Sequence, residues 1–380
     1  MGCNVCRPSE PEALFKSGMP LNKNEARLKK NNPHKKEDYN NFLLLFENNL
    51  QYLGQYITQQ DFNSYITPDV QNYMIEHPLN INQELYKESE TYEVKPVEFK
   101  NGNIYFGNWN ENLKMEGRGK YYLKEDRVLA EGYWGNGDLI YSRVFFPNGD
   151  IYEGEMKDST FHGKGKLTSA NGDIYEGNFV NGEKSGNGKL IFADKTVYEG
   201  AFEKGEFKGN GKMKWPNGYE YCGNFEGPKL SGFGVLSNSS RDIYEGDFDN
   251  NLFNGKGKYI YENGNVYEGE FQYGVKKGKG VYICLNKFEY DGDWDNDLPC
   301  GVGILRNWNK NGVIKSTWRY GKIMEEPVYE KGTAKDFEGI DFNFIPSKMN
   351  LKTKELSHLE IIDINSSQYK IGTYPSFLEE

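Results

Sequence analysis

Glycine–lysine strings are the first features of this chain whose residue types could do chemistry. They occur at Gly165-Lys166, Gly188-Lys189, Gly211-Lys212 and Gly257-Lys258. A loop that binds nucleotide phosphates needs Ser or Thr directly after the lysine and a helix behind it. Leu, Leu, Met and Tyr follow these four lysines, and the strings fall between predicted strands. We therefore expect no nucleotide chemistry at them.

An alternating acidic run offers a second candidate, because its spacing is that of a calcium loop. The run consists of Asp291, Asp293, Asp295 and Asp297. A calcium loop needs glycine at its sixth position and glutamate at its twelfth, where this chain has Asn296 and Val302. The histidines are scattered, and no Ser/His/Asp or Cys/His pairing stands out. We expect no metal site, no cofactor and no catalytic residues, and hence no enzyme.

The N-terminus carries residues suited to lipid attachment. After removal of Met1, Gly2 is the residue that N-myristoylation requires, although the general motif prefers Ser or Thr where Cys6 stands. Gly2 with Cys3 and Cys6 is similar to the dually acylated N-termini of Src-type kinases and some G-protein α subunits, in which the cysteines carry palmitate. One myristate gives only marginal membrane binding, so these residues predict a two-signal anchor. The alternative is an ordinary flexible arm.

Basic residues follow in the same arm. Residues 1 to 36 hold eight Lys/Arg and three Asp/Glu, a net charge of +5, within a chain of net charge −10. Such a cluster favours an anionic cytoplasmic leaflet, and its alternative is a solvated linker. The residues of the cluster are Lys23, Arg27, Lys29, Lys30, Lys35 and Lys36. Residues 101 to 320 hold 28 Lys/Arg against 31 Asp/Glu, which argues against nucleic-acid binding.

A strict 23-residue period organises most of the remaining chain. A Tyr-x-Gly triplet begins at Tyr152, Tyr175, Tyr198, Tyr221, Tyr244, Tyr267 and Tyr290. A Gly-x-Gly triplet follows 11 residues after each tyrosine, first at Gly163. Such a period indicates a repeat architecture, in which each unit contacts mainly its neighbours. It favours a binding or assembly surface over a catalytic pocket.

One repeat, residues 148 to 170, predicts a two-stranded β-hairpin. Asn148-Gly149 is a turn dipeptide because both residues tolerate positive φ. In the alternating run behind it, Tyr152 and Glu153 point to opposite faces of the strand. The second run returns Lys166 to the face of Glu153, which suits opposite-charge pairs across the strands. Glycine between two aromatic residues leaves room for a ring from the next strand.

These residues resemble the MORN-repeat family, whose unit runs roughly YEGEW-x-N-G-x-x-x-G-x-G. The resemblance covers residues 101 to 320, about ten units, from Tyr105 through a degenerate unit at Ala130 to a terminal one at Ile314 to Trp318. It implies a mainly β fold: an elongated single-layer antiparallel sheet of hairpins. It also implies roles in membrane–cytoskeleton contacts and in cilia or flagella, and some members associate with phosphoinositides.

The aromatic stripe along the repeats predicts an open groove for a partner. We expect it to receive an extended or helical segment of another protein, a second copy of the chain, or the chain's own tail. Its residues are Tyr152, Tyr175, Phe179, Tyr198, Phe202, Tyr221, Phe225, Tyr244, Phe248, Tyr267, Phe271, Tyr290 and Trp294.

The flanks divide the chain into four parts: an acylatable basic arm (1–36), a helical cap (37–100), the array (101–320) and an irregular tail (321–380). An apolar stripe predicts a helix over 38 to about 60; it comprises Phe42, Phe46, Leu50, Leu53 and Ile57. A second helix is expected after Thr67-Pro68. We expect the helices to cap the first hairpin, with partner binding as the alternative, and the tail or a helix to cover part of the groove.

Together these patterns predict a non-enzymatic, membrane-anchored scaffold that links a membrane to cytoskeletal or signalling proteins. No run approaches the ~18 apolar residues of a membrane span, no secretory signal is expected, and the cysteines suggest a reduced cytosolic setting. We expect the inner face of a membrane, the cell cortex or a cilium or flagellum as its location, and a homodimer. The alternatives are a structural component of an axoneme or cytoskeletal assembly without lipid, and a regulator that holds an enzyme.

Overall fold

The computed structural model describes residues 33–79, 91–338 and 340. The described chain is mainly β, an open antiparallel sheet built from hairpins, with small helices near the N-terminus, so the expected fold class is confirmed. It divides into two compact units, one up to Gly186 and the other from Asn187 onward. The boundary falls inside β11 (Glu183–Ile191).

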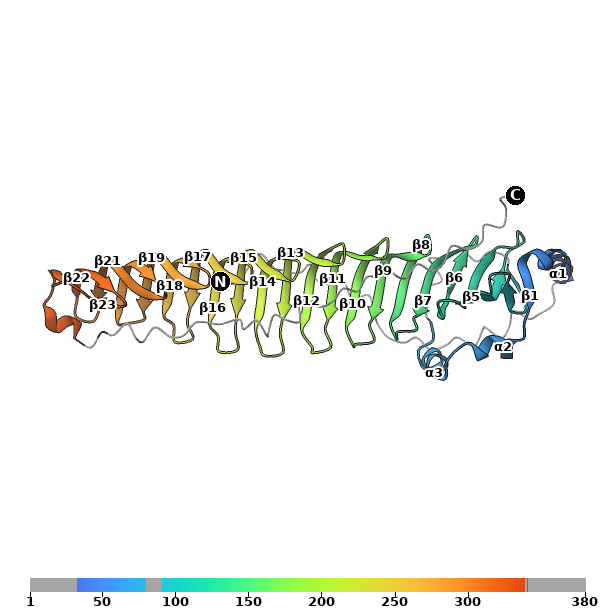
Figure 1. Ribbon diagram of the computed structural model, residues 1–380, viewed down its shortest axis with the longest axis horizontal. Coiled ribbons are helices and arrows are strands. Elements are labelled where there is room, and N and C mark those ends of the chain that lie inside the picture. The colour runs from blue at the N-terminus through green and yellow to red at the C-terminus, as the bar shows by residue number, and fades with distance from the viewer. Residues whose placement is uncertain (1–32, 80–90, 339, 341–380) are drawn as a thin grey trace. The chain divides into compact units, whose positions relative to one another are not determined.

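The first unit begins with three helices and continues as antiparallel strands (Figure 1). Thr58 caps α2, in a capping box with Asp61, and Thr67 caps α3, which has Pro68 in its first turn. The elements are α1 (Pro33–Leu53), β1 (Gly54–Tyr56), α2 (Gln59–Ser64), α3 (Pro68–Glu76), β2 (Tyr92–Glu93), β3 (Val97–Phe99), β4 (Ile104–Trp109), β5 (Met115–Leu123), β6 (Val128–Gly135), β7 (Asp138–Phe145), β8 (Ile151–Lys157), β9 (Thr160–Thr168) and β10 (Ile174–Val180).

Helix α1 is shorter at its C-terminal end than the apolar stripe predicts. It ends at Leu53 because Gly54 starts a strand that pairs with β3. A Cβ on Gly54 would lie 1.9 Å from the Glu98 carbonyl oxygen, so this close backbone approach requires glycine. Ile57, expected on the helix, lies beyond β1 and packs with α2 and α3 instead. The helix also begins earlier than expected, at Pro33.

The second unit consists of further hairpins, and short strands cover the outer edge of β22. Beyond β22, the short β23 and β24 pair with its free side, and the Phe337 ring lies against Gly312. The elements are β12 (Val197–Glu203), β13 (Glu206–Lys214), β14 (Glu220–Glu226), β15 (Lys229–Ser237), β16 (Ile243–Asp249), β17 (Leu252–Ile260), β18 (Val266–Gln272), β19 (Val275–Cys284), β20 (Phe288–Asp295), β21 (Leu298–Asn307), β22 (Gly312–Arg319), β23 (Lys322–Ile323), β24 (Val328–Lys331) and the 3-10 helix η3 (Ala334–Phe337).

Glycines lie opposite one another from strand to strand and make space for the tyrosines. In the hairpin β8–β9, Gly154 faces Gly165, and Gly165 faces Gly177 of β10. A Cβ on Gly165 would lie 2.6 Å from the Tyr152 hydroxyl oxygen. The tyrosine ring therefore lies flat across the neighbouring strand, as the glycine pattern predicts. Its hydroxyl donates a hydrogen bond of 2.7 Å to the Glu155 carbonyl.

Candidate functional site

The aromatic stripe forms the core of the array and not an open groove. The side chains expected to line the groove are each between 0% and 4% exposed: Tyr152, Tyr175, Phe179, Tyr198, Phe202, Tyr221, Phe225, Tyr244, Phe248, Tyr267, Phe271, Tyr290 and Trp294. Tyr244 shows why: its ring meets Phe248 and Phe271 edge-on with centroids 5.1 Å apart, and stacks on Phe253 at 3.7 Å. Successive repeats thus cover each other's rings, and the expectation of exposed aromatic side chains is corrected.

Two lysines interrupt this aromatic core, and the sequence analysis missed both. Nine residues after the repeat tyrosine, three repeats carry Phe, whereas two carry Lys184 and Lys276. Lys184 is 5% exposed, and its ammonium lies 5.3 Å from the centre of the Tyr175 ring. Burial lowers the pKa of Lys184 to about 8, although the Asp173 carboxylate acts in the opposite direction. Lys276 donates to the Tyr261 hydroxyl at 2.6 Å.

The opposite face of the sheet, the charged face, carries alternating charges across the strands. In the first unit, Glu131 faces Arg143, Arg143 faces Glu153, and Glu153 faces Lys166. Arg143 is buried and forms ion pairs with Glu131 at 3.1 Å and with Glu153 at 2.8 Å. Desolvation raises the pKa of Glu131, against the attraction of Arg143. The predicted opposite-charge pattern is therefore present, with Arg143 as its most buried member.

The helices α2 and α3 lie on this charged face, and α1 contacts the aromatic side of the first hairpin. Phe62 and Ile66 belong to a cluster with apolar residues of β4 to β7, against which Tyr73 also packs. Arg143 donates to the His77 carbonyl, at the C-terminal end of α3, at 2.5 Å. Phe46 of α1 meets Trp109 edge-on at 4.9 Å. The helical segment thus covers more of the array than its first hairpin.

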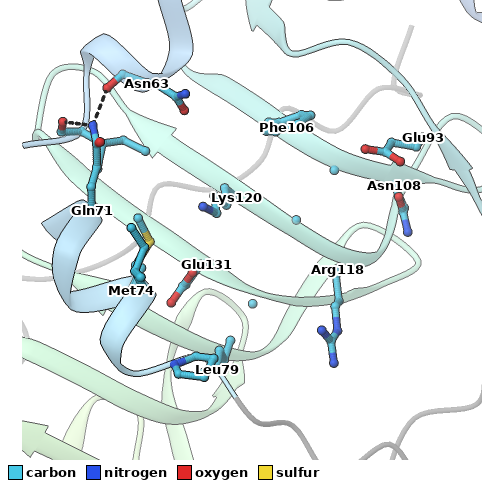
Figure 2. Close-up of a pocket in the computed structure, with 16 residues that line it drawn as sticks. Asn63, Gln71, Met74, Leu79, Glu93, Phe106, Asn108, Arg118, Lys120 and Glu131 are labelled. Atoms are coloured by element: carbon cyan, nitrogen blue, oxygen red, sulfur yellow. Dashed lines mark hydrogen bonds between the residues drawn. The ribbon is translucent and has the colours of Figure 1, made fainter. Parts of the chain in front are cut away.

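A cleft of about 620 Å³ lies between α2–α3 and the strands β4 to β6. Figure 2 shows Met74 and Gln71 on the helical side and Lys120 and Glu131 on the strands. Ile75, which is 78% exposed, also lines the cleft. Apolar and polar groups therefore converge on one hollow, which is the usual composition of a ligand or peptide site. Sequence periodicity could not reveal it, because the cleft depends on where the helices dock.

Most of the residues expected to bind the membrane lie outside the part of the chain that the structure describes. Gly2, Cys3, Cys6, Lys23, Arg27, Lys29 and Lys30 lie outside the described residues, whereas Lys35 and Lys36 lie in α1. Among the described helices, none combines the length and the apolarity that crossing a bilayer demands. Within the same described residues, no group of His, Cys, Asp or Glu is suited to hold a metal ion.

Comparison with solved structures returns distant likenesses. The TCP10c domain of Drosophila melanogaster Sas-4 is 12% identical, with a TM-score of 0.19, over 44% of this chain and 93% of that one. The SAS-4 TCP domain of Drosophila melanogaster in complex with a proline-rich motif of Ana2 is 11% identical, with a TM-score of 0.18, over 50% and 84%. Virginiamycin B lyase from Staphylococcus aureus is 11% identical, with a TM-score of 0.14, over 63% and 85%. Scores this low support no argument about the present chain.

Comparison with protein families gives a definite result, whereas no curated protein matches the sequence. The MORN repeat model matches residues 152–174, 175–197, 198–218, 244–266, 267–286 and 290–308. The stretch it passes over forms the hairpin β14–β15, in which Cys222 and Val235 replace the usual Glu and Lys of the charged face. Period, glycine pairs and hairpin register agree with this match: the chain contains six MORN repeats across residues 152–308.

Proposed function

We propose that the chain is a non-enzymatic scaffold that holds partner proteins on the charged face of its MORN array. One observation carries this proposal: the aromatic side chains are buried against each other. The rings are therefore unavailable to a partner, whereas the charged face carries exposed side chains such as Lys189 and Glu199 that another protein can contact. MORN repeats, as a repeat architecture, suit such a role because neighbouring units build a continuous binding surface.

The cleft beside α2–α3 is the part of this face best suited to a partner. Met74, Ile75 and Phe106 supply apolar contact area, while Lys120 and Glu131 supply charge. An apolar centre with a polar rim is the usual anatomy of a protein interface. Ile75 is a large apolar side chain at 78% exposure, so covering it would contribute binding free energy. We propose that a segment of a partner protein occupies this cleft.

We further propose that acylation attaches the scaffold to the inner face of a membrane. Gly2 supplies the myristate acceptor, and Cys3 and Cys6 supply thiols for palmitate. Lys23, Arg27, Lys29 and Lys30 precede α1 and would add attraction to anionic lipids. Two such signals are needed for stable attachment, since a single chain dissociates readily.

Membrane fractionation of the full chain with an alkyne-myristate label tests this proposal. The wild type should carry the label and sediment with membranes, whereas Gly2→Ala and the double variant Cys3→Ser/Cys6→Ser should become soluble. Cys284→Ser is a matched control, because Cys284 lies in a repeat and is half-buried. An unlabelled wild type that stays with a detergent-resistant cytoskeletal fraction would contradict the anchor and favour the lipid-free structural component.

A further inference from the structure

The docking of α2–α3 shows which kind of element the charged face accepts. The helices pack on one row of apolar residues in which each member faces the next across the strands, namely Ile104, Tyr122, Leu129, Phe145 and Ile151. Beside this row, Arg143 lies between Glu131 and Glu153 and donates to the carbonyl of His77, the residue that follows α3. An apolar row and a cation at the helix C-terminus together hold the helix.

The second unit carries an equivalent row of apolar residues, called here the apolar strip. Ile243 faces Ile260, Ile260 faces Val266, and Val266 faces Ile283, on the strands β16 to β19. All four side chains are half-buried and point to the charged face, opposite the tyrosines. The sole helical element that the structure describes from Asn187 to Glu338 is η3, which lies against β22. No described helix therefore covers this strip.

The charges beside the strip repeat those beside α3. Glu245 faces Lys258, and Lys258 faces Glu268, in the positions that Glu131, Arg143 and Glu153 hold in the first unit. The Lys258 ammonium lies 3.9 Å from Glu268, with 44% of the lysine side chain exposed. Because the lysine side chain is partly exposed, a carbonyl placed above it would be within reach, as the His77 carbonyl is for Arg143.

Charged neighbours limit the strip to four strands. On one side, the next positions of the row are Ser237 and Glu220, and Glu220 forms an ion pair with Lys214 at 2.9 Å. On the other side, the next positions of the row are Glu289 and Arg306, which form an ion pair at 2.6 Å. Four strands span about 14 Å, which is the length of roughly nine helical residues. Helix α3 has 9 residues.

We propose that Ile243, Ile260, Val266 and Ile283 form a docking strip for a short amphipathic helix of a partner protein. The helix presents apolar side chains at the spacing of Val70, Tyr73 and Met74, and its C-terminal carbonyls meet Lys258. Helix docking on an apolar surface through i, i+3 and i+4 anchors is a recurring mode of recognition. The inference rests on the proposed scaffold function and assigns it a second surface and a class of ligand.

A peptide of residues 58–79, which contains α2 and α3, is the probe for this strip. Its fluorescence anisotropy is measured with the full-length protein. We expect the peptide to bind the wild type saturably. Binding to Ile260→Asp should be at least about tenfold weaker, because a carboxylate would be buried under the helix. Binding to Lys258→Met should be severalfold weaker. Thr168→Asp is the matched control, because Thr168 faces Ile151 in the corresponding row of the first unit. The affinity of this variant for the peptide should equal that of the wild type. A probe with Val70→Asp and Tyr73→Asp should not bind.

Failure to bind the wild type, or equal binding to wild type and Ile260→Asp, would overturn the docking strip. If Ile260→Asp does not fold, Ile260→Ser and Val266→Ser decide instead, since they remove apolar area without adding charge. If the peptide binds only after residues 341–380 are deleted, the chain's own tail occupies the strip. That result would overturn the proposal that a partner protein binds there. Membrane anchoring and contacts at the cleft are measured separately, so loss of peptide binding alone would refute the strip and leave the scaffold proposal standing.

Discussion

At the residue scale, the glycine pairs and the tyrosines explain each other. Each tyrosine needs a strand without side chains beneath its ring, and its hydroxyl reaches a backbone carbonyl three residues on, as Tyr198 does with Ala201 at 2.9 Å. The sequence alone predicts this room for a ring. The sequence does not predict that each tyrosine ring is buried, because its burial depends on aromatic rings from neighbouring repeats. The expected open groove was wrong for that reason.

A pair of glycine substitutions in β13 tests the space requirement. A Cβ on Gly211 would lie 2.6 Å from the Tyr198 ring, whereas a Cβ on Gly209 meets nothing within 4 Å. Gly211→Ala should therefore lower the free energy of unfolding by about 3 kcal/mol or more. Gly209→Ala, which carries only the cost of its positive φ of 71°, should lose about 1 kcal/mol. Urea unfolding measures both, and equal losses would contradict the packing described for Tyr198.

The buried Lys184 makes a pH-dependent prediction. Because its pKa falls from 10.5 to about 8 on folding, the unfolded chain binds a proton more readily between these pH values. The lysine therefore destabilises the fold fully below pH 8, and this penalty fades as the pH rises toward 10.5. Lys184→Met should raise the free energy of unfolding at neutral pH by about 1–3 kcal/mol.

Unfolding of Lys184→Met and wild type at several pH values measures the effect. The difference between the two proteins should be largest at pH 7 and should shrink above pH 8. Lys189→Met serves as the control, because the Lys189 side chain is 47% exposed and its removal should change stability by a few tenths of a kcal/mol. A Lys184 difference that is constant across this range would contradict the buried ammonium.

At the element scale, the sequence predicts the hairpins and helix starts better than it predicts where the helices pack on the sheet. Turn dipeptides and alternation predict the hairpins, and Thr67-Pro68 marks the start of α3. The end of α1 was misplaced because the apolar stripe runs past Gly54, whose pairing with β3 no periodicity reveals. The position of α2–α3 on the charged face was missed for a related reason. It depends on contacts with residues such as Phe145, about 70 positions further along the chain.

Arg143 links α3 to the sheet, and its removal should release the helix. Arg143→Met would leave Glu131 and Glu153 without their partner and the His77 carbonyl without its donor. Removal of one partner from a buried ion pair costs about 3–5 kcal/mol. We expect faster hydrogen exchange in residues 59–76 and faster proteolysis at the same segment. Arg306→Met is the control: Arg306 pairs with Glu289 on the second unit, so its loss should leave exchange in α3 unchanged.

At the scale of the whole molecule, the chain combines a closed aromatic core with an exposed charged face. The sequence predicts the repeat class, and the six matched MORN repeats agree with it. It could not predict the cleft, because the cleft exists only where α2–α3 lie beside β4 to β6. Partner binding therefore belongs to the charged face in this account, and the acylated N-terminus stays a prediction.

Site-specific photocrosslinking in cells tests the central claim, that partners bind on the charged face at the cleft, most directly. A photoreactive amino acid replaces Ile75, which lines the cleft, or Tyr52, which is 66% exposed on α1 and does not line it. The account predicts a discrete protein adduct from position 75 that is absent from position 52 and reduced by Lys120→Glu, a change within the cleft. Equal adducts from both positions, or none from position 75, would contradict it.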